Sequence, residues 1–481
     1  MRRFVIIGGG ISGLAAAYEL EYQLRGPSER ASEIVLIEES PELGGKLRSE
    51  RIDGFTLDWG PDGFLSRKRG ALAICDELGL TPRLIGRRRA QSGSMIRRNG
   101  RLFPLPEGFS GLVPANLDAL RTTPLLTPEG RARALAEPDV PPRAQARDDD
   151  ESIAEFMSRR FGREAFERLI EPLVSGIFAG NADTLSLAAT YPALRQTELR
   201  RGGLTGGLGA PADGAERSAN PALPAMVSLR EGMGSLADAL ASSLMRTRVE
   251  LRSKAKAVQP GGASLLLEDG RQLPADAVII AAPAHAAAGL VAGLDPPLSS
   301  LLAEISFVST TIVQLAFAPG VAPAVPTGYD YVVPAVEESP FRACTVSSAK
   351  WEGRAPEGSL LVRLHLRDGA ASDENRLIEL SRAELRTTLG ITEPPILAKV
   401  HEWRSAMPQY TIGHLRRIDA ITRRLDVLAE GGCRLQLAGA SYRGVGIPDC
   451  IESGREAARR VVALSAASAV GVDGRRQGGD R

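Results

Sequence analysis

The stretch that decides the fold is FVIIGGGISGLAAAYEL at residues 4–20, followed by EIVLIEESPELGGKLRS at residues 33–49. The apolar run at residues 4–7 predicts a strand, and the glycines after it predict a tight turn. The Ala-rich run after Gly13 predicts a helix. A second apolar run at residues 34–37 predicts a second strand, which ends on Glu38. The order of these elements predicts a βαβ unit with two parallel strands.

The glycine spacing in this unit indicates a dinucleotide-binding turn. Gly8 permits the tight turn from strand to helix, and Gly10 lets the backbone approach a pyrophosphate. Gly13 lets the helix pack close to the strand, with its N-terminal amides directed at the phosphates. Glu38 follows Gly13 by 25 residues, and the polar insert at 25–32 predicts a loop that accounts for the extra length. An acid at this position is expected to bind the ribose hydroxyls.

A second glycine pair, Gly44-Gly45, lies directly behind the βαβ unit. This double glycine narrows the predicted dinucleotide to FAD.

Composition limits the classes of function. A chain of 481 residues is expected to form two or three domains. With 43% hydrophobic and 24% charged residues, it has the composition of a globular protein. The net charge of +1 creates no overall field that would attract nucleic acid.

Cysteines and histidines are few and scattered. The four cysteines contain no C-x-x-C pair, and the four histidines lie far apart, so we expect neither a metal site nor a disulfide framework. Such cysteine usage suits a reducing compartment, and we expect a cytoplasmic protein. No window of 18 uncharged apolar residues predicts a transmembrane span. A peripheral membrane contact stays open.

The pattern of elements predicts an α/β fold with α+β elements. We expect a discontinuous, Rossmann-like FAD-binding domain, a second substrate domain and a helical insertion. The final helix is expected to end at Leu464. The predicted segments are an FAD-binding domain in three parts (1–66, 221–299 and 401–465), an insertion with a substrate or membrane-contact region (67–220), a substrate-binding domain (300–400) and a disordered tail (466–481).

Four further stretches carry a family resemblance. They are DWGPDGF at 58–64, LIEPLVSGIFAG at 169–180, GVGIPDCIESGR at 444–455, and Trp403 with PQYTIGH at 408–414. With the glycine motifs, they make the chain resemble the porphyrinogen oxidases, a branch of the flavin amine oxidase-like proteins, from about residue 4 to residue 464.

This resemblance implies an FAD-dependent oxidase of haem biosynthesis. Such enzymes convert a porphyrinogen to the porphyrin by repeated hydride transfer to the flavin, with oxygen as the usual acceptor. The stretches 64–68, 93–96 and 343–345, the last followed by Lys350-Trp351, resemble the coproporphyrinogen branch. Ser94 stands where the protoporphyrinogen branch often has arginine. We therefore favour coproporphyrinogen III as substrate, with protoporphyrinogen IX as the alternative.

The motifs and the resemblance together assign a flavin site. Lys46 is either a phosphate partner or a surface lysine, and Val258 either contacts adenine or packs in its strand. Ser441-Tyr442-Arg443 replace the cysteine of covalent flavoproteins, so non-covalent FAD is expected. The assigned residues are Gly8, Gly9, Gly10, Ile11, Ser12, Gly13, Glu38, Glu39, Gly44, Gly45, Lys46, Gly60, Pro61, Asp62, Gly63, Ala255, Val258, Trp403, Val445, Gly446 and Ile447.

The substrate site needs an apolar slot for a flat ring and cations for its propionates. Arg67, Lys68 and Arg97 are the candidate cations, with surface positions as the alternative, and Tyr410 either lines the slot or belongs to the core. No catalytic base, triad or metal site is indicated. The run at 103–114 is either a rim for a membrane or a chelatase partner, or an ordinary loop.

Two other functions stay open at this point. One is an amine oxidase or carotenoid desaturase on the same fold. The other is a non-catalytic flavoprotein that carries a porphyrin. The sequence does not indicate the oligomeric state.

Overall fold

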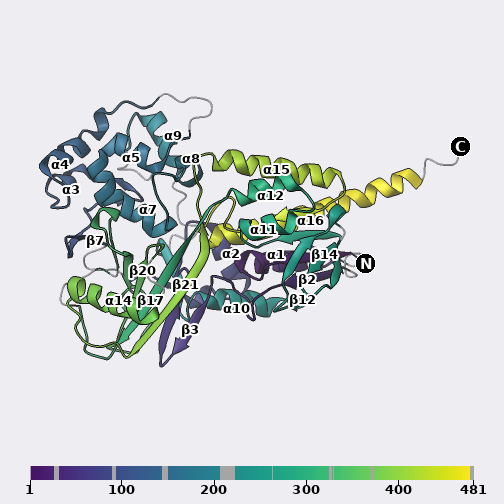
Figure 1. The fold of residues 1–481 in the computed structure, drawn as a ribbon, viewed down its shortest axis with the longest axis horizontal. Helices are drawn as coiled ribbons and strands as arrows, with labels where there is room; N and C mark the ends of the chain where they lie inside the picture. Colours follow the sequence, from purple (N-terminus) through teal and green to yellow (C-terminus); the bar gives the residue numbers. More distant parts are fainter. Residues whose placement is uncertain are drawn as a thin grey trace.

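The computed structural model of this chain describes residues 2–26, 32–88, 94–143, 150–205, 223–262, 264–323, 328, 330–369 and 373–476. The loop predicted at 25–32 lies mostly outside the described residues, as does the end of the predicted tail. The segment at 201–221, whose Gly/Ala/Ser-rich composition also predicts a loop, lies mostly outside them as well. The expected mixture of helix and sheet is confirmed. Figure 1 shows a parallel α/β region on the right, an antiparallel sheet at the lower left and a group of helices at the upper left.

The predicted βαβ unit lies at the centre of a five-stranded parallel sheet. The strands of this sheet are almost wholly apolar, because helices cover one face and helices with a small three-stranded sheet cover the other. Phe4 and Ile6 face α1 (Ile11–Gln23), α10 (Gly234–Ser243) and α16 (Ile447–Arg476). Val5 and Ile7 face the opposite layer, which contains α11 (Ala284–Val291), α12 (Pro296–Ala303) and α15 (His414–Glu430). The strand order is β12 (Thr247–Glu250), β2 (Glu33–Ile37), β1 (Arg3–Ile7), β16 (Ala277–Ile280) and β22 (Leu435–Leu437).

The last helix packs against the first. A Cβ at Gly454 would lie 2.1 Å from the Ser12 carbonyl oxygen, so only glycine lets α16 approach α1 this closely. The predicted end of this helix at Leu464 is wrong, because α16 continues to Arg476 and projects from the body in Figure 1. The tail predicted to be disordered is therefore helical as far as Arg476. Its alanine-rich start favours helix over coil.

A seven-stranded sheet forms the second layer of the molecule. All neighbouring strands are antiparallel except β18 and β7. Strand β21 runs through the boundary placed between residues 400 and 401, and β7 and β8 join this sheet although they lie in the segment expected to form the insertion. The order is β21 (Leu397–Pro408), β17 (Phe307–Phe317), β20 (Leu360–Leu366), β19 (Phe341–Val346), β18 (Asp330–Val332), β7 (Met95–Arg98) and β8 (Arg101–Pro104).

The two faces of this sheet differ in chemistry. One face packs its apolar residues against α14 (Glu374–Leu389). Because strand residues alternate between faces, Arg363 and His365 of β20 lie on the opposite face from Leu364 and Leu366. That opposite face meets residues 58–60 and the helical group.

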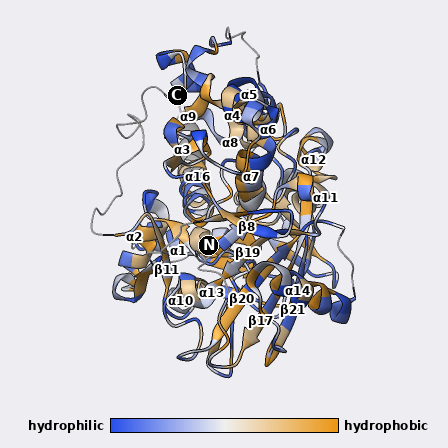
Figure 2. Cartoon of the chain, turned by 90° about the vertical axis from the view of Figure 1, so that its left-hand side faces the viewer, coloured by the Kyte–Doolittle hydropathy of each residue, from blue (hydrophilic) through white to orange (hydrophobic). Residues whose placement is uncertain are grey.

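The helical group has its own core of aromatic and aliphatic side chains. Ser152 and Glu155 form a capping box at the start of α5. In Figure 2, α7 lies between the other helices of the group and β19. The helices are α3 (Leu117–Arg121), α4 (Pro128–Leu135), α5 (Ile153–Phe161), α6 (Arg163–Ala165), the π-helix η4 (Phe166–Ile170), α7 (Glu171–Phe178), α8 (Leu187–Thr190) and α9 (Pro192–Arg201).

The apolar run at 103–114 turns inward. Phe103, Leu105 and Phe109 pack against the helical core, and Leu112 and Val113 are buried in it. These apolar side chains are therefore wholly or partly buried against the helical core. No helix in the described part of the chain has both the length and the apolar composition to cross a bilayer.

The remaining elements are short and connect the layers. They are β3 (Ser49–Ile52), β4 (Phe55–Asp58), β5 (Phe64–Leu65), α2 (Arg69–Glu77), η2 (Thr81–Arg83), β6 (Leu84–Gly86), β9 (Phe109–Ser110), β10 (Val113–Pro114), η3 (Glu137–Asp139), β11 (Met226–Leu229), β13 (Ala255–Val258), η5 (Pro260–Gly262), β14 (Ser264–Leu267), β15 (Gln272–Pro274), η6 (Ala335–Glu337) and α13 (Ser347–Lys350).

Candidate active site

The turn from β1 to α1 is built around three glycines with different surroundings. Gly8 has φ of +105°, and a Cβ at Gly13 would lie 1.8 Å from the Gly8 carbonyl oxygen. Gly10 has ordinary extended φ and ψ of −71° and 178°, and a Cβ there would meet no atom within 4 Å. Gly10 is also the N-cap of α1 and offers no side chain to the first amides. The turn therefore presents an open space before free helix N–H groups, as a pyrophosphate requires.

The double-glycine segment lies directly beside this turn. The Gly44 N–H donates to the Gly9 carbonyl at 2.9 Å, and Gly44 pairs with Gly10 in an isolated parallel bridge. Gly45 has φ of +57°, and its Cβ would lie 3.1 Å from the Gly10 Cα. The two glycine motifs that the sequence separates are thus in contact, and together they form one cradle.

Lys46 follows this contact and is half-buried. Burial lowers the pKa of its ammonium. The main chain at Lys46 is also confined, because a Cβ at Gly60 would lie 1.8 Å from the Lys46 carbonyl oxygen. A desolvated cation beside a turn with free amides suits an anionic partner such as phosphate.

Glu38 lies at the end of β2, next to the cradle. Its carboxylate accepts from the N–H of Gly9 at 2.6 Å and from the N–H of Ser40 at 2.8 Å. Glu39 is exposed. The Glu38 carbonyl accepts from the Ser253 N–H at 2.9 Å, so the start of β13 lies nearby. On that strand Ala255 is half-buried, whereas Val258 is buried in the core, which is the packing alternative for this residue.

Three successive carbonyls of the DWGPDGF segment accept hydrogen bonds from three strands of the second sheet. Gln314 on β17 donates to Asp58 at 3.2 Å, and Trp403 on β21 donates through its indole N–H to Trp59 at 2.7 Å. The third donor is the Arg363 guanidinium on β20, which reaches the Gly60 carbonyl at 2.5 Å. Trp403 thus holds the main chain of the segment that was expected to border the flavin.

Asp62, in the same segment, has a different task from the cofactor contact expected of it. Its carboxylate accepts from Lys350 Nζ at 2.8 Å and from the Trp351 indole N–H at 3.0 Å. Burial alone would raise the pKa of this carboxyl, but Lys350 and Arg363 outweigh it and hold the pKa well below its usual range. The side chain therefore fixes the segment to α13. Pro61 is exposed and Gly63 half-buried beside it.

Replacement of Asp62 by asparagine is expected to lower the free energy of unfolding at pH 7 by roughly 2–4 kcal/mol, because Lys350 loses its counter-ion. The folded pKa lies below the unfolded value near 4, so this stabilisation is present above about pH 4 and is lost as the pH falls further. Urea unfolding at pH 7 and pH 3 measures both effects. Asp118→Asn, at a position 87% exposed, is the control. Equal stability of Asp62→Asn and wild type at pH 7 would refute this role.

The start of α16 forms the opposite side of the site. Helix α16 begins at Ile447, directly after Val445 and Gly446 and four residues before the start at Ile451 that the sequence predicts. The Asp449 carboxylate accepts from the Gly446 N–H at 3.2 Å, within the first turn. Tyr410 donates to the Ala440 carbonyl at 2.6 Å and accepts from the Gly444 N–H at 2.8 Å.

Two of the candidate substrate residues have structural partners instead. Tyr410 is buried, and its ring stacks on His414 with centroids 4.1 Å apart, so the core alternative applies. Lys68 forms an ion pair of 2.7 Å with Asp449 and thereby links the first turns of α2 and α16. Arg67 is exposed.

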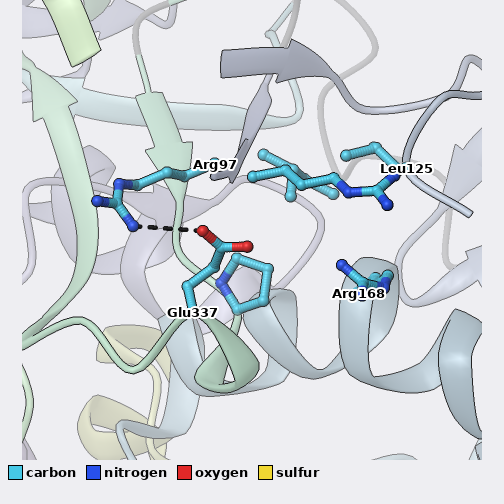
Figure 3. A pocket seen from close by; sticks show the side chains of 7 residues that line it. Arg97, Leu125, Arg168 and Glu337 are labelled. Carbon is cyan, nitrogen blue, oxygen red and sulfur yellow. Dashed lines mark hydrogen bonds and ion pairs between the residues drawn. The ribbon is translucent and has the colours of Figure 1, made fainter. Parts of the chain in front are cut away.

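Arg97 is the second candidate cation that already has partners within the protein. It lies on β7 and forms ion pairs with Glu337 at 3.4 Å and with Glu384 of α14 at 3.1 Å. Figure 3 shows the Arg97 guanidinium directed at Glu337, with Leu125 and Arg168 on the other side of a small cavity. Strand alternation places Arg97 on the α14 face of the sheet, away from the DWGPDGF segment.

Sequence reasoning missed the residues that join the two sheets. Gln314, Lys350 and Arg363 were not assigned a role, although Lys350 was noted in a motif. A signal was present in the run LLVRLHL at 360–366, where Arg363 and His365 alternate with apolar residues. Charged residues at alternate positions of an otherwise apolar strand indicate a buried polar face.

Comparisons with known proteins cover nearly the whole chain. The family described as flavin containing amine oxidoreductase matches residues 11–462. A coproporphyrinogen III oxidase from Bacillus subtilis is 35% identical over 95% of this chain and 97% of its own length. A protoporphyrinogen oxidase from Bos taurus is 33% identical over 96% of this chain and 98% of its own length.

Solved structures agree with these matches. A structure from Exiguobacterium sp. 255-15, provisionally named a protoporphyrinogen oxidase, has a TM-score of 0.83 and 30% identity, covering 96% of this chain and 98% of that one. Cyclohexylamine oxidase from Brevibacterium oxydans has a TM-score of 0.69 at 16% identity, covering 97% of this chain and 99% of that one. The second likeness is one of fold alone.

Proposed function

Because the chain belongs to the flavin-containing amine oxidoreductases and, within them, to the porphyrinogen oxidases, as its motifs predicted, we propose that it oxidises coproporphyrinogen III to coproporphyrin III. Oxygen is the proposed acceptor, and haem biosynthesis the proposed context. One observation carries the assignment of a redox site: residues 58–60 lie between the glycine cradle and the second sheet. Gly60 packs against the Lys46 carbonyl of the cradle, and three strands of the sheet donate hydrogen bonds to residues 58–60. A flavin held in the cradle would then lie beside the sheet.

The flavin is proposed to be FAD, bound without a covalent link. Gly8–Gly13 and Gly44–Lys46 would hold the pyrophosphate, and Glu38 the adenosine ribose. The open space at Gly10 supports this fit. Cys450 lies one turn into α16, but burial raises the pKa of its thiol to about 11 and keeps it protonated, so it is a poor nucleophile for flavin attachment.

The bound flavin would supply the two-electron acceptor for each oxidation of the porphyrinogen. The residues of the chain position and shield this chemistry. The N-terminus of α16 directs its positive end to the site and would stabilise negative charge there. Arg363 and Trp403 hold the main chain of residues 59 and 60, and the sheet behind them excludes water.

Turnover of the two porphyrinogens, measured side by side in air by porphyrin fluorescence, tests the proposal. We expect a kcat/KM for coproporphyrinogen III at least tenfold above that for protoporphyrinogen IX, about 1.4 kcal/mol. Its four carboxylates offer more partners to the cations of the site.

Other outcomes would each redirect the assignment. A preference for protoporphyrinogen IX, the substrate in the name of the bovine relative, would keep the reaction and change the substrate. Bound flavin that neither porphyrinogen reduces without oxygen would favour a carrier. Turnover of amines instead would favour an amine oxidase.

A further inference from the structure

The polar face of the second sheet holds guanidinium groups that are buried without full partners. Arg342 and Arg363 are each 5% exposed, and the Nε–H of each has no hydrogen-bond partner among the described residues. Burial of a cation without full hydrogen-bond partners lowers the stability of the folded protein. Groups buried in this way are frequent at functional sites.

A β-bulge explains why Arg342 lies on this face. The register of β19 against β20 shifts between Phe341 and Ala343, with Ala343 opposite His365 and Phe341 opposite Leu366. Bulges of this kind turn a side chain out of the regular alternation and are frequent next to active sites. Phe341 belongs to the apolar core on the α14 face.

Arg367 continues the alternation of β20 toward the helical group. Its guanidinium donates to the Val333 carbonyl at 2.7 Å and lies 3.5 Å from the Ser175 hydroxyl on α7. Arg342 and Arg367 are neighbours on this face, because the Val333 N–H donates to the Arg342 carbonyl at 2.8 Å and the Val333 carbonyl accepts from Arg367. Burial and the neighbouring Arg367 lower the pKa of Arg342 to about 10.

The carboxylates near this pair do not satisfy it. Glu171 accepts from the Ala335 N–H at 3.0 Å, and burial raises the pKa of its carboxyl. Asp368 also attracts Arg342, but it is exposed to solvent and accepts from the Ser309 N–H at 3.2 Å. A half-buried carboxylate, that of Glu171, and an exposed one, that of Asp368, thus face the buried guanidinium of Arg342 and the half-buried guanidinium of Arg367.

An apolar side chain lies next to the pair. Val332 on β18 is opposite Ala343, the residue after Arg342, and is half-buried. A Cβ at Gly176 would lie 3.8 Å from Val332 Cγ1, so α7 runs close to the sheet at this point. A flat apolar ring that carries acidic side chains matches a surface with both features.

We propose that Arg342 and Arg367 bind a carboxylate of the substrate, and so contribute to its recognition at the end of the sheet nearest α7. This proposal rests on the proposed function and names residues for its substrate site. A propionate would accept hydrogen bonds from both guanidinium groups. It would thereby give the Arg342 Nε–H the hydrogen-bond partner that it lacks. Arg97, Lys68 and Tyr410 already have partners within the protein, so they are weaker candidates for this contact.

The test compares binding of coproporphyrin III with binding of its tetramethyl ester, in one mild detergent, to the flavin-loaded protein. We expect wild type to bind the free acid at least tenfold more tightly than the ester. In Arg342→Met and in Arg367→Met this ratio should fall below threefold, with ester binding unchanged. The Arg404 side chain lies on the same sheet and is 82% exposed. Arg404→Met therefore removes a solvent-exposed charge and should keep the wild-type ratio of acid to ester affinity.

A kinetic measurement on the same variants adds a second readout. The two Arg variants should raise KM for coproporphyrinogen III about tenfold and change kcat less than twofold. Glu171→Gln should act in the opposite direction and bind the free acid severalfold more tightly, because it removes the competing carboxylate. If an arginine variant fails to fold, Glu171→Gln alone decides the proposal.

The outcomes separate this inference from the proposed function. An unchanged ratio in folded Arg342→Met and Arg367→Met would overturn the inference, whether or not wild type turns the substrate over. Equal wild-type affinity for acid and ester would overturn it as well. A wild type that binds porphyrin with the expected ratio but oxidises neither porphyrinogen would refute the proposed function and leave the binding site standing.

Discussion

Replacement of Gly10 by valine is expected to give a folded apoprotein that binds flavin at least a hundredfold more weakly than wild type, about 2.7 kcal/mol. The backbone at Gly10 has φ of −71°, which any residue adopts, and a Cβ there would meet no atom within 4 Å. The cost to folding is limited to the poorer helix cap, about 1 kcal/mol or less. The added side chain would fill the space that the cradle leaves for the pyrophosphate. Flavin fluorescence titration and a thermal melt of the apoprotein measure the two effects.

Gly13→Ala is the matched comparison, since it changes the same turn with the opposite expected result. Its Cβ would lie 1.8 Å from the Gly8 carbonyl oxygen, a clash with backbone that cannot move aside. We expect loss of the folded protein rather than selective loss of flavin. If Gly10→Val bound flavin with wild-type affinity, the turn between β1 and α1 would not be the phosphate site.

Asp58→Ala is expected to lower the free energy of unfolding by about 3–5 kcal/mol, because it leaves Arg354 buried without its counter-ion. Arg354 is 1% exposed, and its guanidinium contacts the Asp58 carboxylate at 3.0 Å. The same carboxylate accepts from the Met233 N–H at 2.8 Å and from the Ser49 hydroxyl at 2.6 Å. Asp58 thus ties the N-terminal segment to the turn before α10. Urea unfolding of the apoprotein measures the loss.

Two further variants show whether the lost stability comes from the charge of Arg354 that is left without a counter-ion. The double variant Asp58→Ala with Arg354→Met should recover part of the lost stability, because it removes the unpaired cation. Glu402→Ala breaks an exposed pair with Arg404 and should cost less than about 1 kcal/mol. A loss below about 1 kcal/mol in Asp58→Ala would contradict this account.

The glycine turn and the helices that flank it were largely predictable from sequence. Turns and helix starts are local, so the spacing of Gly8, Gly10 and Gly13 predicted both the turn and the helix that follows. A helix after the GVGIPDC motif was predicted for the same reason, although it begins at Ile447 rather than at Ile451. The apolar strands of a parallel sheet are also evident from composition alone.

The substrate half was not predictable in the same way. Lys68 and Arg97 were reasonable candidate cations, yet they pair with Asp449 and with Glu337 and Glu384, which lie far away in the chain. No sequence spacing records such a pairing, because it depends on how the sheets and helices dock. The bulge that places Arg342 beside Arg367 is likewise a property of strand register.

The sequence by itself determined the βαβ unit, the flavin family and the two glycine motifs, because each depends on residues that are neighbours in the chain. The tertiary structure alone decided that Gly44 touches Gly9, that three strands hold residues 58–60, and which cations stay unpaired. The physical reason is that a charge is free or neutralised according to what surrounds it in space, and its surroundings here come from segments hundreds of residues apart.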